Sequence, residues 1–221
     1  MKRPALRLFL VRHGTVHANR EWRHLGRRDD PLSREGFTQA QRLGQSFAEL
    51  EIASVLTSPL SRSVITARAI ADTVGAPLTA DHRLIEMDFG RWEGLTKREV
   101  LELSEEDRLH FERWQRDPEV APPGGESLVE VQQRCSNLLE QLVADPPAGP
   151  VVIVSHVGPI KTMLCTALDL PLLATRRFFL DPGTITVVDW EERAFLRLFN
   201  SHGHLGWTSA RWMQDVGELV V

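Results

Sequence analysis

Two short apolar runs, far apart in the chain, each lead into a histidine. Leu6–Val11 is followed by Arg12 and His13, and Val151–Ser155 is followed by His156. Continuous aliphatic or β-branched runs of this length are typical of strands that a parallel sheet buries on both faces. The pattern therefore predicts two interior strands whose ends carry histidines.

Further strands and helices are expected between and after these runs. Ser54–Thr57 is a third candidate strand, while Thr184–Trp190 and Ala194–Asn200 are expected to form a hairpin at the edge of the sheet. Apolar spacings of three and four residues predict helices over 33–50, over 60–74, from Ser127, and after His156. Alternating strands and helices predict an α/β fold, a three-layer α/β/α sandwich with a mostly parallel central sheet and helices on both faces.

The ends of these helices carry recognisable signals. Ser33 is the expected N-cap of the first helix, whose inward stripe consists of Phe37, Ala40, Leu43, Phe47 and Leu50. Gly75 ends the second helix. Ser127 and Glu130 form a capping box at the start of the third.

The segment Arg91–Pro123 breaks the alternation of strands and helices. It is charged, contains Trp92 and Trp114, and has a capping box at Thr96 and Glu99. We interpret this segment as a small helical insertion over the active site. One domain is expected to span residues 1–221.

The charge of the chain limits its partners. Lys and Arg total 26 against 30 Asp and Glu, which gives a formal net charge of −4. A chain of this sign repels polyanions, so nucleic acid and acidic membrane surfaces are not expected as partners. Affinity for a small anion must come from basic residues gathered in one pocket.

The cysteine and apolar content indicate the compartment. Cys135 and Cys165 are the two cysteines and have no CxxC spacing, which fits a reducing environment. No apolar run reaches the ~18 residues of a membrane span, and the start lacks the apolar core of a signal peptide. We therefore expect a cytoplasmic protein, and a homodimer is one open alternative for its assembly.

The residues that follow the predicted strands share an affinity for phosphate. Arg12 and His13 follow the first strand, Arg62 lies shortly after Ser54–Thr57, and His156 follows Val151–Ser155. Ligands of open α/β sheets bind at the carboxyl ends of the strands. Guanidinium forks donate paired hydrogen bonds to phosphate oxygens, and imidazole can donate to them or attack phosphorus. The pattern predicts an anion site at this edge.

The ordered set of motifs resembles the histidine phosphatase superfamily, the phosphoglycerate-mutase-like group. The residues that carry the resemblance are Arg12-His13-Gly14, Ser58-Pro59-Leu60-Ser61-Arg62, Glu86 in the run 86–94, Ser155-His156, Asn19, the run 26–33 and the run 123–127. The resemblance implies that His13 is a nucleophile that forms a phosphohistidine. It implies that Arg12, Arg62 and His156 bind the phosphoryl group and that Glu86 protonates the leaving oxygen. Asn19, Gly26 and Val157 are the substrate-binding residues that it implies.

This set of residues suits phosphoryl transfer, which needs in-line positioning and neutralisation of charge. Neither a metal nor a cofactor is expected, and we interpret His202-Gly203-His204 as part of a loop or tail. Glu86 must be protonated to act as an acid, so we expect its pKa to be raised. Asp88 and Glu93 are nearby rivals for that role.

Departures from the family pattern favour hydrolysis. The run 108–116 has no adjacent Arg pair and the chain has no tyrosine, whereas cofactor-dependent mutases of the family usually have both features. Thr15 and Val16 follow Gly14 where many members have Glu-Thr, a departure that alters the pocket wall and leaves the nucleophile intact. The context of Glu86 looks like that of α-ribazole phosphatases and fructose-2,6-bisphosphatase-like enzymes. We predict a phosphatase of a small phosphorylated metabolite. A bisphosphoglycerate-dependent phosphoglycerate mutase and a non-catalytic phosphate-binding module are the alternatives.

Overall fold

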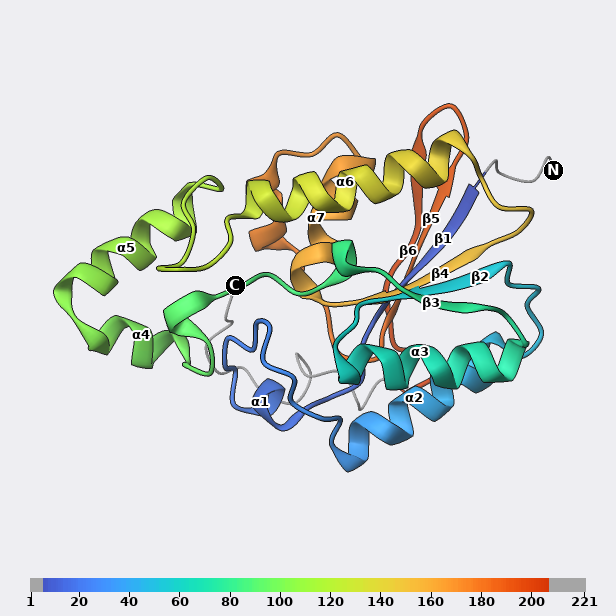
Figure 1. Ribbon diagram of the computed structural model, residues 1–221, viewed down its shortest axis with the longest axis horizontal. Helices are drawn as coiled ribbons and strands as arrows, with labels where there is room; N and C mark the ends of the chain where they lie inside the picture. Colours follow the sequence, from blue (N-terminus) through green and yellow to red (C-terminus); the bar gives the residue numbers. More distant parts are fainter. Residues whose placement is uncertain (1–5, 207–221) are drawn as a thin grey trace.

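The sheet has a mostly parallel core. The computed structural model describes residues 6–206, in which six strands pair in the order β3-β2-β4-β1-β5-β6 (Figure 1). The strands are β1 (Leu6–Arg12), β2 (Ser54–Thr57), β3 (Leu78–Ala80), β4 (Val151–Ser155), β5 (Ile185–Trp190) and β6 (Ala194–Ser201). The first four are mutually parallel, and β5 is antiparallel to both β1 and β6. The α/β prediction and the edge hairpin are confirmed, whereas the short strand β3 was not predicted.

Helices cover both faces of this sheet. The α-helices are α1 (His17–Arg20), α2 (Arg34–Phe47), α3 (Ser61–Val74), α4 (Lys97–Leu103), α5 (Glu105–Arg116), α6 (Leu128–Ala144) and α7 (Val157–Ala167). Short 3-10 helices are η1 (His82–Leu84), η2 (Gly90–Trp92) and η3 (Leu172–Arg177). Figure 1 shows α2 and α3 on one face and α6 and α7 on the other, which confirms the three layers. Within residues 6–206, no helix is both long and apolar enough to cross a bilayer.

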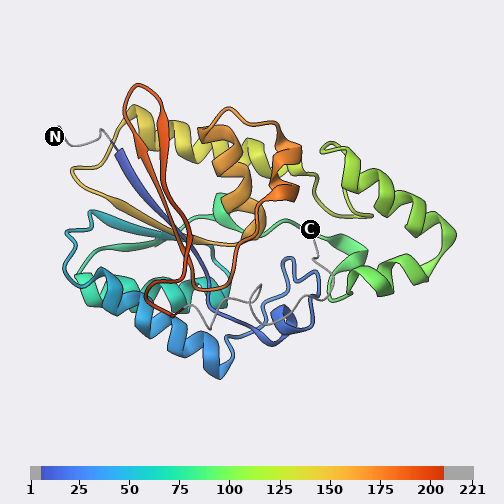
Figure 2. The same cartoon turned by 180° about the vertical axis from the view of Figure 1, so that it is seen from behind.

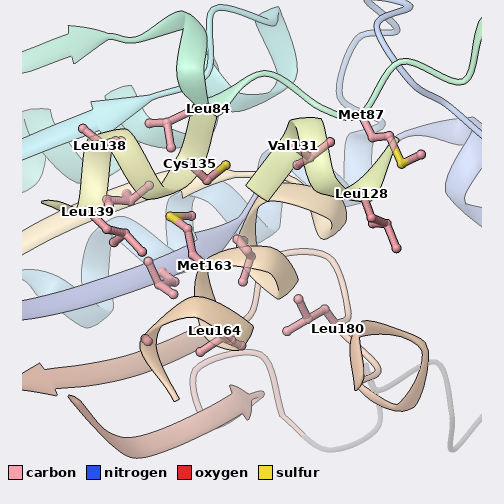
Figure 3. Close-up of a cluster of buried hydrophobic side chains, with 14 of the residues drawn as sticks. Leu84, Met87, Leu128, Val131, Cys135, Leu138, Leu139, Met163, Leu164 and Leu180 are labelled. Carbon is pink, nitrogen blue, oxygen red and sulfur yellow. The ribbon is translucent and has the colours of Figure 1, made fainter. Parts of the chain in front are cut away.

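The two faces are buried by side chains that alternate along the strands. Leu8, Leu10 and Ile153 belong to the larger core, which Figure 3 shows between α6, α7 and the sheet. Val11 and Val154 belong to the core under α2 and α3. Because β4 is buried on both faces, Val151–Val154 is a continuous apolar run, and β1 is apolar in the same way from Leu8 to Val11. Their pairing places Arg12 opposite Ser155 and so fixes the loops that follow.

The predicted helix ends are confirmed. Ser33 Oγ accepts a hydrogen bond from Gly36 N (3.1 Å), and Gly75 closes α3 with a φ of 68°. At the start of α6, Ser127 Oγ accepts from Glu130 N (3.2 Å) while Glu130 Oε2 accepts from Ser127 N (2.7 Å). These bonds satisfy N–H groups that the first helical turn leaves without partners.

The prediction of which residues of the helix over 33–50 face inward was wrong at both ends. Phe37 is 47% exposed and Leu50 is 40% exposed. The buried positions of the first turns belong instead to Gly36 and Gln39. Gln39 Oε1 accepts from the Thr15 backbone N (2.7 Å), so this part of the helix packs on a polar loop rather than on the apolar core.

The segment 91–123 contains α4 and α5. Its predicted capping box is present: Thr96 Oγ1 accepts from Glu99 N (3.2 Å) and Glu99 Oε2 accepts from Thr96 N (2.8 Å). Figure 1 shows the two helices beyond the carboxyl ends of the parallel strands. The Trp92 ring lies 5.7 Å from that of Trp114, measured between centroids, which anchors α5 from inside the segment.

Candidate active site

The five residues proposed for catalysis meet at the carboxyl edge of the sheet. His13 and His156 follow the neighbouring strands β1 and β4, and the centroids of their rings are 5.0 Å apart. The charge of Arg62 acts on both rings, as does that of Arg12. Glu86 joins them through Gly158, which lies two residues after His156 and donates its N–H to Glu86 Oε1 (3.1 Å). All five side chains are buried.

The ring of His13 is fixed in one tautomer. Its Nδ1 lies 2.7 Å from the carbonyl oxygen of Gly14. A carbonyl oxygen can only accept, so Nδ1 carries the proton and Nε2 carries the lone pair. Burial holds the pKa of His13 well below its usual range, and the charges of Arg62 and Arg12 add to this effect. The result is a neutral imidazole with a free electron pair on Nε2.

Gly14 holds its position because α2 approaches it closely. A β-carbon on Gly14 would lie 2.5 Å from the carbonyl oxygen of Gly36, which is far inside contact distance. The backbone N of Gly14 also donates to Thr66 Oγ1 (3.1 Å) in α3. Two helices therefore hold the residue whose carbonyl orients His13, and only glycine fits between them.

The ring of His156 is held by serines. Its Nε2 lies 2.8 Å from Ser58 Oγ and 3.3 Å from Ser63 Oγ. Its Nδ1 is buried and has no hydrogen-bond partner in the described chain. Burial, followed by the charge of Arg62, holds the pKa of His156 well below its usual range. Nδ1 is thus the ring atom left to contact a ligand.

Backbone carbonyls accept hydrogen bonds from both arginines. Arg12 Nη1 donates to Leu180 O (2.6 Å). Arg62 donates from Nη1 to Arg28 O (2.5 Å) and from Nη2 to Gly26 O (2.8 Å). Its Nε is buried with no hydrogen-bond partner within residues 6–206, and burial lowers the pKa of this guanidinium. A buried cation held in this way favours an anionic ligand.

Glu86 has the environment of a proton donor. Burial raises its pKa and outweighs the opposing effects of the hydrogen bond from Met87 N (2.8 Å) and of the two arginines. Gly158 admits this carboxyl group, since a β-carbon there would lie 2.6 Å from Glu86 Oε1. The raised pKa keeps more of the carboxyl protonated near neutral pH.

The rival carboxylates have structural partners. Asp88 Oδ1 accepts from Gly90 N (2.7 Å), and Glu93 Oε1 accepts from Arg27 N (2.6 Å). Each carboxylate thus stabilises a turn of the loops at the edge of the site. These contacts favour Glu86 over Asp88 and Glu93 as the acid.

The three residues expected to bind substrate lie in the loops around this centre. Asn19 is buried and its Oδ1 accepts from Val16 N (3.0 Å). Gly26, with a φ of 57°, presents its carbonyl to Arg62. Val157 is half-buried in the first turn of α7. Their contact with substrate stays a prediction.

Several supporting residues were missed by sequence reasoning. Ser58 stood inside a quoted motif and Gly158 lies two residues after another, but their spacing gave no sign that Ser58 would hold His156 or that Gly158 would admit Glu86. Ser63 and Thr66 lie in the first half of α3. The helical period predicts that they face the site only once the orientation of Arg62 is known. Their roles depend on contacts between elements that are distant in the sequence.

Two other parts of the described chain are weaker candidates for a functional site. A hollow of about 810 Å³ lies at the opposite, amino-terminal edge of the strands, and Arg7 in its wall is already paired with Asp189 (2.6 Å). His202 and His204 contact Asp181 Oδ2 (2.9 Å) and Gly183 O (2.8 Å), so they brace the turn before β5. Within residues 6–206, no group of three or more His, Cys, Asp or Glu residues is placed to hold a metal.

Buried neutral histidines should make the fold sensitive to acid. Burial, followed by the charge of Arg176, lowers the pKa of His24 to about 4. The unfolded chain takes up protons below pH ~6.5 while folded His24 does not, so stability is present above that pH and is lost as the pH falls. Between pH 7 and pH 5, we expect His24 to contribute a loss of about 2 kcal/mol to the free energy of unfolding.

Urea unfolding of wild type and His24→Phe at both pH values measures this contribution. The wild type should lose about 2 kcal/mol more than the variant. His82→Ala, at an exposed histidine, is the matched control and should lose as much as the wild type. Equal losses in wild type and His24→Phe would show that His24 is not held neutral.

Comparison with known proteins identifies relatives over nearly the whole described chain. The family model of the histidine phosphatase superfamily (branch 1) matches residues 8–201. Phosphoserine phosphatase 1 of Hydrogenobacter thermophilus is 35% identical over 91% of this chain and 95% of its own length. A probable phosphoglycerate mutase of Salmonella choleraesuis is 34% identical over 86% of this chain and 88% of its own length. A bifunctional protein of Mycobacterium tuberculosis is 35% identical over 90% of this chain, which spans only 55% of that protein.

Solved structures share the fold. YhfR of Bacillus stearothermophilus has a TM-score of 0.82 and 28% identity, covering 91% of this chain and 100% of its own. The α-ribazole phosphatase of Shigella flexneri has a TM-score of 0.79 and 29% identity, covering 88% and 96%. A mycobacterial glucosyl-3-phosphoglycerate phosphatase has a TM-score of 0.79 and 31% identity, covering 88% and 98%.

Proposed function

The chain belongs to branch 1 of the histidine phosphatase superfamily, and on that premise we propose that it is a phosphomonoesterase that works through a phosphohistidine on His13. Its substrate is a small phosphorylated metabolite. The names of its relatives, which include a phosphoserine phosphatase and a glucosyl-3-phosphoglycerate phosphatase, support hydrolysis of such compounds.

The observation that carries the proposal is the state of His13. A neutral imidazole, with Nδ1 bonded to Gly14 O and a lone pair on Nε2, is ready to attack an electrophile. The charges of Arg12 and Arg62 act on the His13 ring, and His156 Nδ1 has no hydrogen-bond partner within residues 6–206. These are the groups that we propose to bind the phosphoryl oxygens. Such donors lower the barrier because they are in place before charge develops on the transferring oxygens.

In the first half-reaction, His13 Nε2 forms a bond to phosphorus as the bond to the leaving oxygen breaks. Glu86 gives its proton to that oxygen, which leaves as an alcohol. The phosphorylated ring keeps its Nδ1 proton on the carbonyl of Gly14. In the second half, water attacks phosphorus, the Glu86 carboxylate takes a proton from the water, and the N–P bond breaks to release phosphate and neutral His13.

We further propose that the enzyme needs no metal and that it acts in the cytoplasm. Arg12 and Arg62 supply positive charge at the transferring group. The free thiols of Cys135 and Cys165 are buried and fit a reducing compartment. The substrate is the one partner we propose for this site.

The second candidate is a phosphoglycerate mutase, which the Salmonella relative favours. A mutase would use the same five residues and would have to protect the phosphohistidine from water. The third candidate, a phosphate-binding module, would bind phosphate without turnover.

The test uses purified protein with p-nitrophenyl phosphate and a panel of phosphorylated metabolites, with and without EDTA. We expect release of inorganic phosphate at the same rate in both conditions. A coupled assay for the interconversion of phosphoglycerates, with and without bisphosphoglycerate, runs in parallel. Isomerisation faster than phosphate release would make the chain a mutase, and binding without any turnover would leave only the binding module.

A further inference from the structure

Three buried nitrogens beside the site have no hydrogen-bond partner among the described residues. They are His24 Nε2, Trp114 Nε1 and Arg176 Nε, none of which has a hydrogen-bond partner in the part of the chain described. His24 is 8% exposed and Trp114 is 3% exposed. Indole and guanidinium N–H groups can only donate, and buried donors without acceptors are costly and rare in folded proteins.

These nitrogens belong to one cluster. The guanidinium carbon of Arg176 lies 3.9 Å from the centroid of the Trp114 ring, and Arg176 Nη2 donates to Trp114 O (3.1 Å). The centroids of the His24 and Trp114 rings are 6.0 Å apart. Figure 2 shows the orange segment that contains η3 beside the light-green insertion. The cluster therefore joins three segments of the chain: the loop that contains His24, the helix α5 and the 3-10 helix η3.

Two cations in this region have no carboxylate of the described residues within ion-pair distance. Within residues 6–206, no carboxylate oxygen lies within 4.0 Å of the charged groups of Arg176 or Lys161. Burial lowers the pKa of Arg176 to about 10. Burial, followed by the charges of Arg12 and Arg176, lowers the pKa of Lys161 to about 8. A bound anion would compensate for both these partly buried charges and the unused donors.

The cluster borders the active site on the side of the proposed acid. Lys161 is close enough to Arg12 and Glu86 for both charges to act on it. The His24 ring stacks on Phe89, three residues after Glu86, with centroids 4.8 Å apart. Because Glu86 is the proposed donor of a proton to the leaving oxygen, the cluster on its side of the site would face the rest of the leaving group.

We propose that His24, Trp114, Arg176 and Lys161 form a second anion subsite, which binds a negatively charged group on the alcohol part of the substrate. The substrate class is then a phosphomonoester whose alcohol carries a carboxylate or a second phosphate. This inference rests on the proposed phosphatase function and adds the chemistry of the leaving group to it.

The first experiment uses the wild-type enzyme and matched substrates. The carboxylate arm compares phosphooxy-alkanoates with two to four carbons against their methyl esters. The phosphate arm compares alkanediol bisphosphates of the same lengths with the monophosphates. We expect the charged member of at least one pair to have a kcat/KM about 10- to 100-fold higher, which is the worth of one or two charge-assisted hydrogen bonds. The arm with the larger ratio identifies the anion.

The second experiment repeats the preferred pair in Arg176→Met and Lys161→Met. Each change should lower the ratio of charged to uncharged kcat/KM about 10-fold, mainly through KM. Arg177→Met is the control, because Arg177 is an exposed arginine on the same 3-10 helix, and it should keep the wild-type ratio.

The outcomes separate this inference from the proposed function. Wild-type ratios near one in both arms, with normal hydrolysis of p-nitrophenyl phosphate, would overturn the subsite and leave the phosphatase standing. A ratio that Arg176→Met and Arg177→Met lower equally would also overturn it. No hydrolysis of any ester would refute the proposed function itself.

Discussion

Replacing His13 with alanine is expected to abolish turnover, lowering kcat by about 10⁴-fold or more, as removal of a covalent nucleophile does elsewhere. The physical reason is that the two ring nitrogens of His13 have different roles. Nδ1 is bonded to the Gly14 carbonyl, so only Nε2 can attack, and no other described imidazole at this centre has the same arrangement. Initial rates with p-nitrophenyl phosphate and with the best metabolite of the panel measure the loss.

A chemical trap gives the same prediction an independent readout. Wild-type protein mixed with ³²P-labelled substrate and quenched in alkaline detergent should carry label that acid releases, as expected for a phosphorus–nitrogen bond. His13→Ala should carry none. His82→Ala, at an exposed histidine on η1, should match the wild type in rate and in label. Full activity in His13→Ala would refute the mechanism.

Replacing Glu86 with glutamine should slow alkyl phosphates about 10²- to 10⁴-fold while slowing p-nitrophenyl phosphate about 10-fold or less. An alkoxide needs a proton as it leaves, whereas p-nitrophenolate is stable without one. The amide keeps the shape of the carboxyl but has no acidic proton. The kcat/KM values of both substrate types in wild type and variant measure the difference, because kcat/KM reports the steps up to phosphorylation of His13 and not the later hydrolysis of the phosphohistidine, in which Glu86 acts as a base.

The pH dependence tests the same role. Burial raises the pKa of Glu86, and the acid acts only when protonated, so wild-type kcat/KM for alkyl phosphates should fall as the pH rises through that pKa. Glu86→Gln should lose this fall. Asp88→Asn and Glu93→Gln are the controls, since each removes a neighbouring carboxylate that stabilises a turn. Equal losses for both leaving groups in Glu86→Gln would assign the proton to another residue.

Strands and helix ends could be predicted because their causes are local. Val151–Ser155 is buried on both faces and is therefore apolar throughout, which the sequence displays directly. The capping box of Ser127 and Glu130 needs only residues three apart. The prediction for α2 was wrong at Phe37, which fits the helical period but is exposed. Gly36 is the residue that faces inward, where it packs against the backbone of the loop after β1. β3 has only three residues and no apolar run to mark it.

The site could be predicted in part for the same reason. Arg12, His13 and His156 stand where strands end, and the topology of an α/β sheet brings such positions together. Glu86 lies in no strand or helix, so only the family resemblance selected it from among its neighbours. Lys161 and Arg176 escaped notice because a basic residue on a helix is usually solvated, whereas both are only partly exposed and Arg176 lies over the Trp114 ring.

The close approach of Gly14 and Gly36 has a consequence for motion at the centre. The carbonyl that decides which nitrogen of His13 holds its proton belongs to a residue wedged beneath the first turn of a helix. Loosening that turn would free the carbonyl and let the proton move from Nδ1 to Nε2. Nε2 would then have no lone pair with which to attack phosphorus. The reactivity of His13 therefore depends on how tightly α2 packs against Gly14.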